Sequence, residues 1–299
     1  MNLTSNEKNE QSLAFGGQAV MEGVMIRSKD HLVISVRQPN DEIVTKSEKL
    51  HSLSTKYGFL KLPFIRGIFS LFETLYAGVK GISFSANAAF AEEDEKETLG
   101  PKEIAVAVVL AVGLSVLLFF ATPFALTTLL DIEGVVFNIV EGVVRLAILL
   151  AYMVVISLFA DFKRIFQYHG AEHAAINTYE AGVELNVENA REHSRFHARC
   201  GTSFLLIVAV VSIVVFSLVS SPNYWVRLSY RILLIPVISS LSYELLRISG
   251  KYKDSLIMRI LIAPGIALQH FTTRPPDDKM LEVALTAVKE VLSVQKASE

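Results

Sequence analysis

The sequence predicts a mainly α-helical, polytopic membrane protein with about four transmembrane helices, a small N-terminal β-meander and a cytoplasmic His-rich helical insertion. Three observations predict this fold class. Apolar residues make up 52% of the 299 residues and charged residues only 19%, and the apolar residues concentrate in blocks. Residues 104–130 carry no charge, and about 20 apolar residues are enough to cross a bilayer. A polar, His-rich stretch, residues 161–202, lies between two pairs of such blocks.

Changes in composition along the chain indicate eight segments. They are a flexible arm (1–14), a small β-meander (15–50), an amphipathic or interfacial helix (51–91), an acidic linker (92–103), a transmembrane helical pair (104–160), the cytoplasmic His-rich insertion (161–202), a second transmembrane helical pair (203–250), and a cytoplasmic surface segment with an amphipathic tail helix (251–299). The meander is predicted because residues 32–37 and 42–45 have strand patterns and residues 38–41 form a turn signal.

The segment 64–90 is mostly apolar, and its only charged residues are Arg66, Glu73 and Lys80. Their seven-residue spacing is nearly two helical turns, so all three side chains lie on one face of a helix. The segment is therefore either an interfacial helix or a membrane span whose charged stripe faces protein. We favour the interfacial helix.

The second predicted span, residues 134–160, carries Glu141 and Arg145 one helical turn apart. Such residues can pair, either as a structural ion pair inside the bundle or as a functional intramembrane pair. Residues 203–221 form a third span, and residues 228–248 form a weaker fourth span with charged flanks. Residues 255–270 are again apolar and either re-enter the membrane or lie on its surface.

Lys and Arg gather in the loop between the second and third spans and after the fourth span. The positive-inside rule therefore places both termini and residues 161–202 on the cytoplasmic side of the cell membrane. The net charge of -2 provides no basic field for nucleic acid. The expected partners are membrane lipids and an unknown substrate or partner protein.

The His-rich insertion contains a candidate metal site. His169 and His173 are four residues apart, so one helix face can offer both imidazoles to one metal ion. Glu172 completes the pattern H-x-x-E-H, which in inverted zinc peptidases supplies two ligands and a carboxylate general base. We therefore expect a divalent metal ion, zinc, bound by the two histidines.

A catalytic zinc site needs a third protein ligand, and His197, Cys200 and Glu188 are candidates. If His197 and Cys200 both bind, the site has four ligands, is closed and is structural. If only one of them binds, an activated water remains and Glu172 can take its proton. The spacing leaves both arrangements open.

Several further motifs accompany this pattern in a fixed order. They are GGQAVMEGVMIR (16–27), PFIRG (63–67), FQYHGAEH (166–173), VENAR (187–191), HARCGTSF (197–204), APG (263–265) and TTRPPDD (272–278). Through these motifs the chain resembles the YqhQ family of bacterial membrane proteins, which are classed as predicted metal-dependent enzymes. The resemblance implies functional roles for His169, Glu172, His173, Glu188, His197, Arg199 and Cys200. It does not extend to His193, which favours a surface position for that residue.

Motifs distant from the histidines add further arginines. If these motifs converge on the cytoplasmic face, basic side chains would hold an anionic substrate; the candidates are Arg27, Arg66, Arg199 and Arg274. The alternative is that the motifs only lock the sheet, helix and tail together.

The leading hypothesis is a membrane-bound, cytoplasm-facing, metal-dependent hydrolase with Glu172 as its catalytic base. One alternative is a metal-stabilised, non-catalytic membrane scaffold that docks partner proteins. The other is a small-solute transporter in which Glu141, Arg145 and Glu244 line a path across the bilayer.

Overall fold

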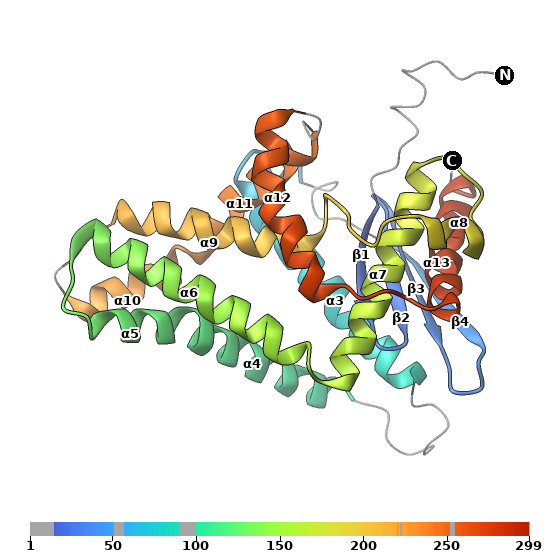
Figure 1. The fold of residues 1–299 in the computed structure, drawn as a ribbon, viewed down its shortest axis with the longest axis horizontal. Helices are drawn as coiled ribbons and strands as arrows, with labels where there is room; N and C mark the ends of the chain where they lie inside the picture. The colour runs from blue at the N-terminus through green and yellow to red at the C-terminus, as the bar shows by residue number, and fades with distance from the viewer. Residues whose placement is uncertain are drawn as a thin grey trace.

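The computed structural model describes residues 15–50, 57–89, 100–219, 221, 223–251 and 255–298. The predicted flexible arm (1–14) and most of the predicted acidic linker (92–99) lie outside these residues. The described chain is mainly α-helical with one small N-terminal antiparallel sheet, which confirms the predicted mixture of elements. A helical bundle extends away from a domain that contains the sheet (Figure 1).

The sheet is a four-stranded meander in which each strand pairs with the next along the chain. Its strands are β1 (Gly16–Val20), β2 (Gly23–Arg27), β3 (His31–Arg37) and β4 (Ile43–Lys49). A two-residue turn, Met21–Glu22, joins β1 to β2, and Glu22 has a positive φ of 49°. Because successive side chains along each strand point to opposite faces of the sheet, the sheet presents two different apolar faces to helices.

Helices α7 (Ala160–Glu180) and α13 (Asp278–Lys296) cover one face of the sheet. Small residues allow the close packing, since Ala171 and Ala175 of α7 and Ala284 of α13 are all fully buried. The tail helix α13 buries the apolar stripe expected from the sequence, including Leu281 and Val288. The last described helix and the first described strands therefore share one hydrophobic core.

Helix α3 (Ile65–Ala89) covers the other face of the sheet, and its charged stripe contacts protein throughout. Arg66 Nε donates to Glu244 Oε1 at 2.7 Å. Glu73 Oε2 accepts from Arg27 Nη2 at 2.9 Å. Lys80 pairs with Glu48 of β4. The predicted seven-residue stripe thus joins α3 to β2, to β4 and to α11 (Ile235–Lys251).

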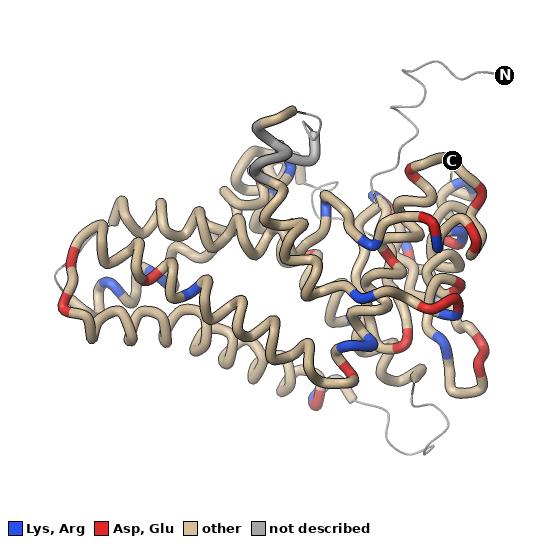
Figure 2. The backbone as a smooth tube through the Cα atoms, in the orientation of Figure 1, with Lys and Arg blue, Asp and Glu red and all other residues tan. Residues whose placement is uncertain are grey.

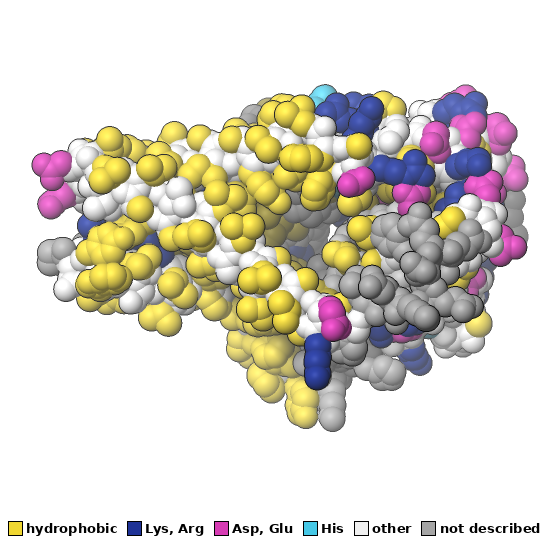
Figure 3. All heavy atoms as spheres, turned by 90° about the horizontal axis from the view of Figure 1, so that it is seen from below, with side chains coloured by type: hydrophobic (Ala, Val, Ile, Leu, Met, Phe, Trp, Pro, Cys, Tyr) yellow, Lys and Arg dark blue, Asp and Glu magenta, His cyan; other side chains and the backbone are white. Residues whose placement is uncertain are grey.

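The bundle is built from helices of different lengths (Figure 1). They are α4 (Pro101–Val116), the π-helical turn η2 (Leu117–Ala121), α5 (Thr122–Thr128), α6 (Gly134–Ile156), α9 (Gly201–Ser217), α10 (Tyr224–Leu233), α11 (Ile235–Lys251) and α12 (Leu256–Thr272). Few charged residues lie along it, whereas they are dense around the sheet (Figure 2). The face seen in Figure 3 is largely apolar over the bundle.

Two helices in the described part of the chain are long and apolar enough to cross a bilayer unaided. They are Lys102–Thr128, with mean hydropathy 2.9 and none of its most apolar window buried, and Gly134–Ile156, with mean hydropathy 2.3 and 22% buried. Such exposed apolar surface suits lipid rather than water. The sequence predicted about four spans. Helix α9 is apolar but has 17 residues, and the predicted fourth span is divided between α10 and α11.

A buried polar network connects α6, α9 and α10. Glu141 accepts from Arg145 Nη2 at 2.6 Å and from Arg231 Nε at 2.9 Å. Arg145 Nη1 also donates to Ser212 Oγ at 2.6 Å. The predicted Glu141–Arg145 pair therefore forms. Arg231, expected to flank the fourth span, is instead only 3% exposed and belongs to the same network.

Candidate metal centre

The H-x-x-E-H motif lies in the middle of α7, and His169 and His173 face the segment before α9. The helix lies close to its neighbours there, since a Cβ atom at Gly170 would overlap the Arg274 carbonyl. His173 and Glu172 are almost fully buried, and His169 is half-buried. The local helical period brings the three side chains together, and the tertiary packing removes them from bulk water.

Backbone carbonyl groups orient both imidazole rings. His169 Nδ1 lies 2.8 Å from the Thr272 carbonyl oxygen, and His173 Nδ1 lies 2.7 Å from that of Arg195. A carbonyl can only accept, so these contacts assign the ring proton to Nδ1 in each histidine. Both Nε2 atoms are then left as acceptors, which is how outer hydrogen bonds prepare histidine for a metal ion.

Cys200 completes a group of three donors. The donor atoms of His169, His173 and Cys200 all lie within 4.8 Å of one another. His169 Nε2 is 3.2 Å from Cys200 Sγ. Burial lowers the pKa of His173, and a neutral imidazole is the form that binds metals. Two imidazole nitrogens and one sulfur are a donor set that suits zinc.

Glu172 lies beside this group without belonging to it. Burial raises the pKa of its carboxyl group, and His169 and His197 oppose that shift. No hydrogen bond or ion pair of Glu172 occurs within the described ranges. It packs against Gly17 of β1, where a Cβ atom would overlap the carboxyl group. The carboxyl group is therefore buried, unpaired and held against the sheet.

The other predicted ligands take different positions. His197 is buried, but its Nε2 lies 3.5 Å from Glu180 Oε1 and its ring lies 5.7 Å from that of His173. Glu188 is exposed on α8 (Val187–Glu192) and lies outside the three-donor group. The half-buried His193 bonds through Nδ1 to the Asn189 carbonyl at 2.7 Å and is also outside the group. The structure thus gathers three of the five predicted ligands.

The three donors open into a pocket of about 450 Å³. It is lined by all of residues 15–19, by α7, by residues 197 and 199–202, and by Thr74 of α3. Of the four arginines proposed for an anionic substrate, Arg199 lines this pocket and pairs with Glu180. Arg27 instead pairs with Glu73 of α3, and Arg66, itself in α3, pairs with Glu244 of α11. Arg274 lies outside the pocket lining.

Two residues that support the site, Gln269 and Thr272, were not predicted from the sequence. Gln269 of α12 is fully buried, and its side chain accepts from His197 N at 2.9 Å and donates to His197 O at 2.8 Å. The Thr272 carbonyl orients His169. The TTRPPDD motif indicated this region. The role of Thr272 could not be predicted from it, because a backbone carbonyl can accept a hydrogen bond whatever the side chain is.

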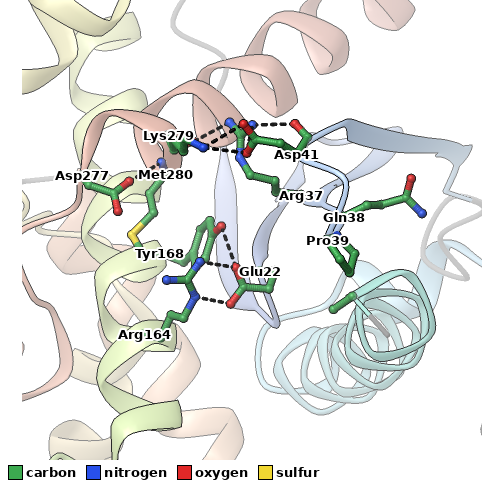
Figure 4. Close-up of a pocket in the computed structure, with 11 residues that line it drawn as sticks. Glu22, Arg37, Gln38, Pro39, Asp41, Arg164, Tyr168, Asp277, Lys279 and Met280 are labelled. Carbon is green, nitrogen blue, oxygen red and sulfur yellow. Dashed lines mark hydrogen bonds and ion pairs between the residues drawn. The ribbon is translucent and has the colours of Figure 1, made fainter. Parts of the chain in front are cut away.

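A second pocket of about 350 Å³ has Glu22, Arg164 and Tyr168 among its lining residues (Figure 4). There Glu22 pairs with Arg164, and Glu22 Oε2 accepts from Tyr168 Oη at 3.3 Å. Burial raises the pKa of Tyr168. Lys279 of α13 pairs with Asp41 at 2.7 Å. The charged groups here neutralise one another, and Glu22 lies outside the three-donor group.

Comparisons with known proteins agree with the motif pattern. The family described as "Protein of unknown function (DUF1385)" matches residues 62–294. The chain is 35% identical over 308 residues to "Uncharacterized protein YqhQ" of Bacillus subtilis (strain 168), covering 98% of this chain and 96% of that protein. No solved structure matches the chain.

Proposed function

The chain belongs to the YqhQ family, and we propose that it is a membrane-bound, metal-dependent hydrolase whose centre is the His169, His173 and Cys200 donor group. One observation carries the proposal. Both histidines donate through Nδ1 to backbone carbonyls, so that their Nε2 atoms face the Cys200 sulfur. Outer hydrogen bonds of this kind fix the tautomer and the ring orientation of histidines that bind metal ions.

Three protein donors leave one position of a tetrahedral zinc site open, as catalytic sites require. A scaffold role predicts a fourth protein ligand, and His197 instead faces Glu180. A bound zinc ion would supply Lewis acidity and lower the pKa of a bound water. The transporter alternative is less well supported, because Glu244 pairs with Arg66 while Glu141 and Arg145 bond to Arg231 and Ser212.

Glu172 is the proposed general base. Burial raises the pKa of its carboxyl group, which makes the carboxylate a stronger base. Glu172 would take a proton from the attacking water and return it to the leaving group. Water is thereby added across the scissile bond: its hydroxyl goes to the acyl carbon and its proton to the leaving atom. His197, buried beside Glu172, would position the segment that carries Cys200.

We place this centre at the cytoplasmic membrane surface. Helices α4–α5, α6, α9 and α10–α11 would form four spans, with both termini cytoplasmic. The turn between α5 and α6 lies at the far end of the bundle from the sheet (Figure 1), and Lys and Arg are concentrated near the sheet (Figure 2). The positive-inside rule then assigns the sheet end to the cytoplasm.

Metal analysis of the purified full chain tests the proposal. The expected result is one metal ion per chain in the parent and in His193→Ala, and loss of metal in His169→Ala, His173→Ala and Cys200→Ala. His193→Ala is a matched control because its ring lies outside the donor group. Circular dichroism and gel filtration identify variants that do not fold. Folded variants that keep equal metal, or a parent without metal, would overturn the proposal.

A further inference from the structure

The outer edge of β1 lies along the pocket that contains Glu172. β1 is the first strand in the sheet order, and within the described part of the chain β2 is its one strand neighbour. The pocket lining includes α7, which covers one face of the sheet, and Thr74 of α3, which covers the other. Because the pocket is lined from both faces, it lies against the free edge of the strand that separates them.

The register of the β1–β2 hairpin determines which backbone groups face this pocket. Val20 pairs with Gly23 across a two-residue turn, and in such a hairpin the closing pair exchanges both of its hydrogen bonds. Bonded and non-bonded pairs alternate, so Gln18 also faces β2. Gly17 and Ala19 therefore direct their N–H and C=O groups outward. No hydrogen bond to those four groups comes from another described segment.

The edge is also sterically open. Residues 16, 17 and 19 are Gly, Gly and Ala, and a Cβ atom at Gly16 would meet nothing within 4 Å. Gly17 is exposed to solvent although it packs against the Glu172 carboxyl group. Paired strands lie about 4.8 Å apart. A strand added to β1 would therefore run directly past Glu172 and the three donors.

We propose that the substrate is an extended polypeptide segment that binds as an additional strand on the edge of β1. This inference rests on the proposed hydrolase function and names its substrate class. The two outward N–H groups and two outward C=O groups would bond to the peptide main chain, as in β-strand addition. Water would then add across one peptide bond. Its hydroxyl goes to the carbonyl carbon and its proton to the nitrogen, which leaves as an amine.

The backbone pattern of the β1 edge favours a peptide over a lipid. Donors and acceptors that alternate along an extended strand match a peptide backbone, whereas a lipid ester offers acceptors only. The pocket also has apolar walls, formed by Phe15, Ile165, Phe166 and Ile176. Because alternate side chains of a strand point the same way, apolar residues at every second position of the peptide would face these walls.

The first test uses the zinc-loaded full chain in detergent and a library of randomised decapeptides with blocked ends. Mass spectrometry detects newly formed termini. The peptide that is cleaved best is then resynthesised with a single N-methyl group at each position in turn. We expect binding to fall about tenfold at every second residue, where the peptide N–H would point towards β1, and to change little in between. This test needs no protein variant.

A second test removes the outward donor of Ala19. Ala19→Pro deletes an N–H that is not part of the β1–β2 ladder, while Ala19→Ser retains it. Peptide binding should weaken about tenfold in Ala19→Pro and stay near the parent value in Ala19→Ser, with full metal content in both.

The possible negative results distinguish the peptide inference from the proposed hydrolase function. Stoichiometric metal without peptide cleavage, or equal effects of N-methylation at all positions, overturns the peptide inference and leaves the metal centre standing. Hydrolysis of phosphatidylglycerol vesicles without peptide cleavage also overturns it, in favour of a lipid substrate. A metal-free parent protein overturns the proposed function itself.

Discussion

Gly17 of β1 lies against the Glu172 carboxyl group of α7, and no side chain can be placed at residue 17 without displacing that group. A Cβ atom there would lie 2.8 Å from Glu172 Cγ and closer still to the carboxyl group. The contact fixes the sheet to the helix that carries the metal centre, so the position of the base depends on a strand 155 residues away in the chain.

Replacing Gly17 with Ala should therefore destabilise the fold. Overpacking of this kind costs about 1–3 kcal/mol in the free energy of unfolding. Gly16→Ala is the control, because its added Cβ meets nothing. In the double variant Gly17→Ala/Glu172→Ala the cost of the added methyl should largely disappear. Thermal or chemical unfolding of the parent, Gly16→Ala, Gly17→Ala, Glu172→Ala and the double variant measures the effect, with the double variant compared to Glu172→Ala. A Gly17→Ala protein as stable as Gly16→Ala would disprove the steric contact.

Zinc should stabilise the folded chain through the three donors. A ligand at 100 times its Kd adds about 2.7 kcal/mol to the free energy of unfolding. Adding zinc should therefore raise the melting temperature of the chelator-treated parent and of His193→Ala, but not that of Cys200→Ala. Differential scanning fluorimetry in detergent measures this. An equal zinc response in Cys200→Ala would exclude the sulfur from the site.

Gln269 should act on the metal through the His197 main chain. Gln269→Leu leaves two buried backbone groups without partners, at about 1–3 kcal/mol each, and frees the segment that carries Cys200. We expect zinc affinity to fall about 10–100-fold, as for other supporting contacts around metal ligands. Gln269→Glu keeps an acceptor for His197 N and should fall between Gln269→Leu and the parent. Chelator competition gives the affinities. Parent-like affinity in Gln269→Leu would show that the segment holds its position without this side chain.

Glu141 should contribute strongly to the stability of the bundle, because it pairs with both buried arginines of the network. Glu141→Gln leaves the buried Arg145 and Arg231 without a counter-charge, and breaking a buried ion pair in this way costs about 3–5 kcal/mol. Replacing Glu141, Arg145 and Arg231 together with Leu should recover much of that stability. Glu133→Gln is an exposed control. Unfolding in detergent gives the comparison, and equal stability of the two single Gln variants would contradict a structural role for the network.

The Glu48–Lys80 pair should make part of the stability dependent on pH. The hydrogen bond from Lys80, the largest cause, lowers the pKa of Glu48 below its usual value of 4.5. The pair therefore stabilises the fold fully above about pH 4.5, and the contribution is lost as pH falls through the lower pKa of the folded state. A pair of this partly exposed kind is worth about 0–1 kcal/mol.

Free energies of unfolding for the parent and Glu48→Gln should accordingly differ at neutral pH and converge under acid conditions. Glu192→Gln, at an exposed position on α8, serves as the comparison. A difference that stays constant across the whole acid range would rule out titration of Glu48 as its source.

The sequence by itself determined the features that depend on local periodicity. Strand alternation predicted the sheet, uncharged blocks predicted the long apolar helices, and four-residue spacing placed His169 and His173 on one helix face. These predictions succeed because backbone geometry fixes the repeat of a helix or strand regardless of what lies around it.

Only the tertiary structure decided how distant segments meet. Cys200, 31 residues beyond His169, joins the two histidines, while His197 turns to Glu180 and Glu188 stays exposed. Arg231 enters the Glu141 network, and the edge of β1 borders the pocket. For the third metal ligand, the sequence left His197, Cys200 and Glu188 as alternatives. The packing of helices against the sheet selected among them, because contact between distant segments depends on the folded path of the whole chain rather than on any local repeat.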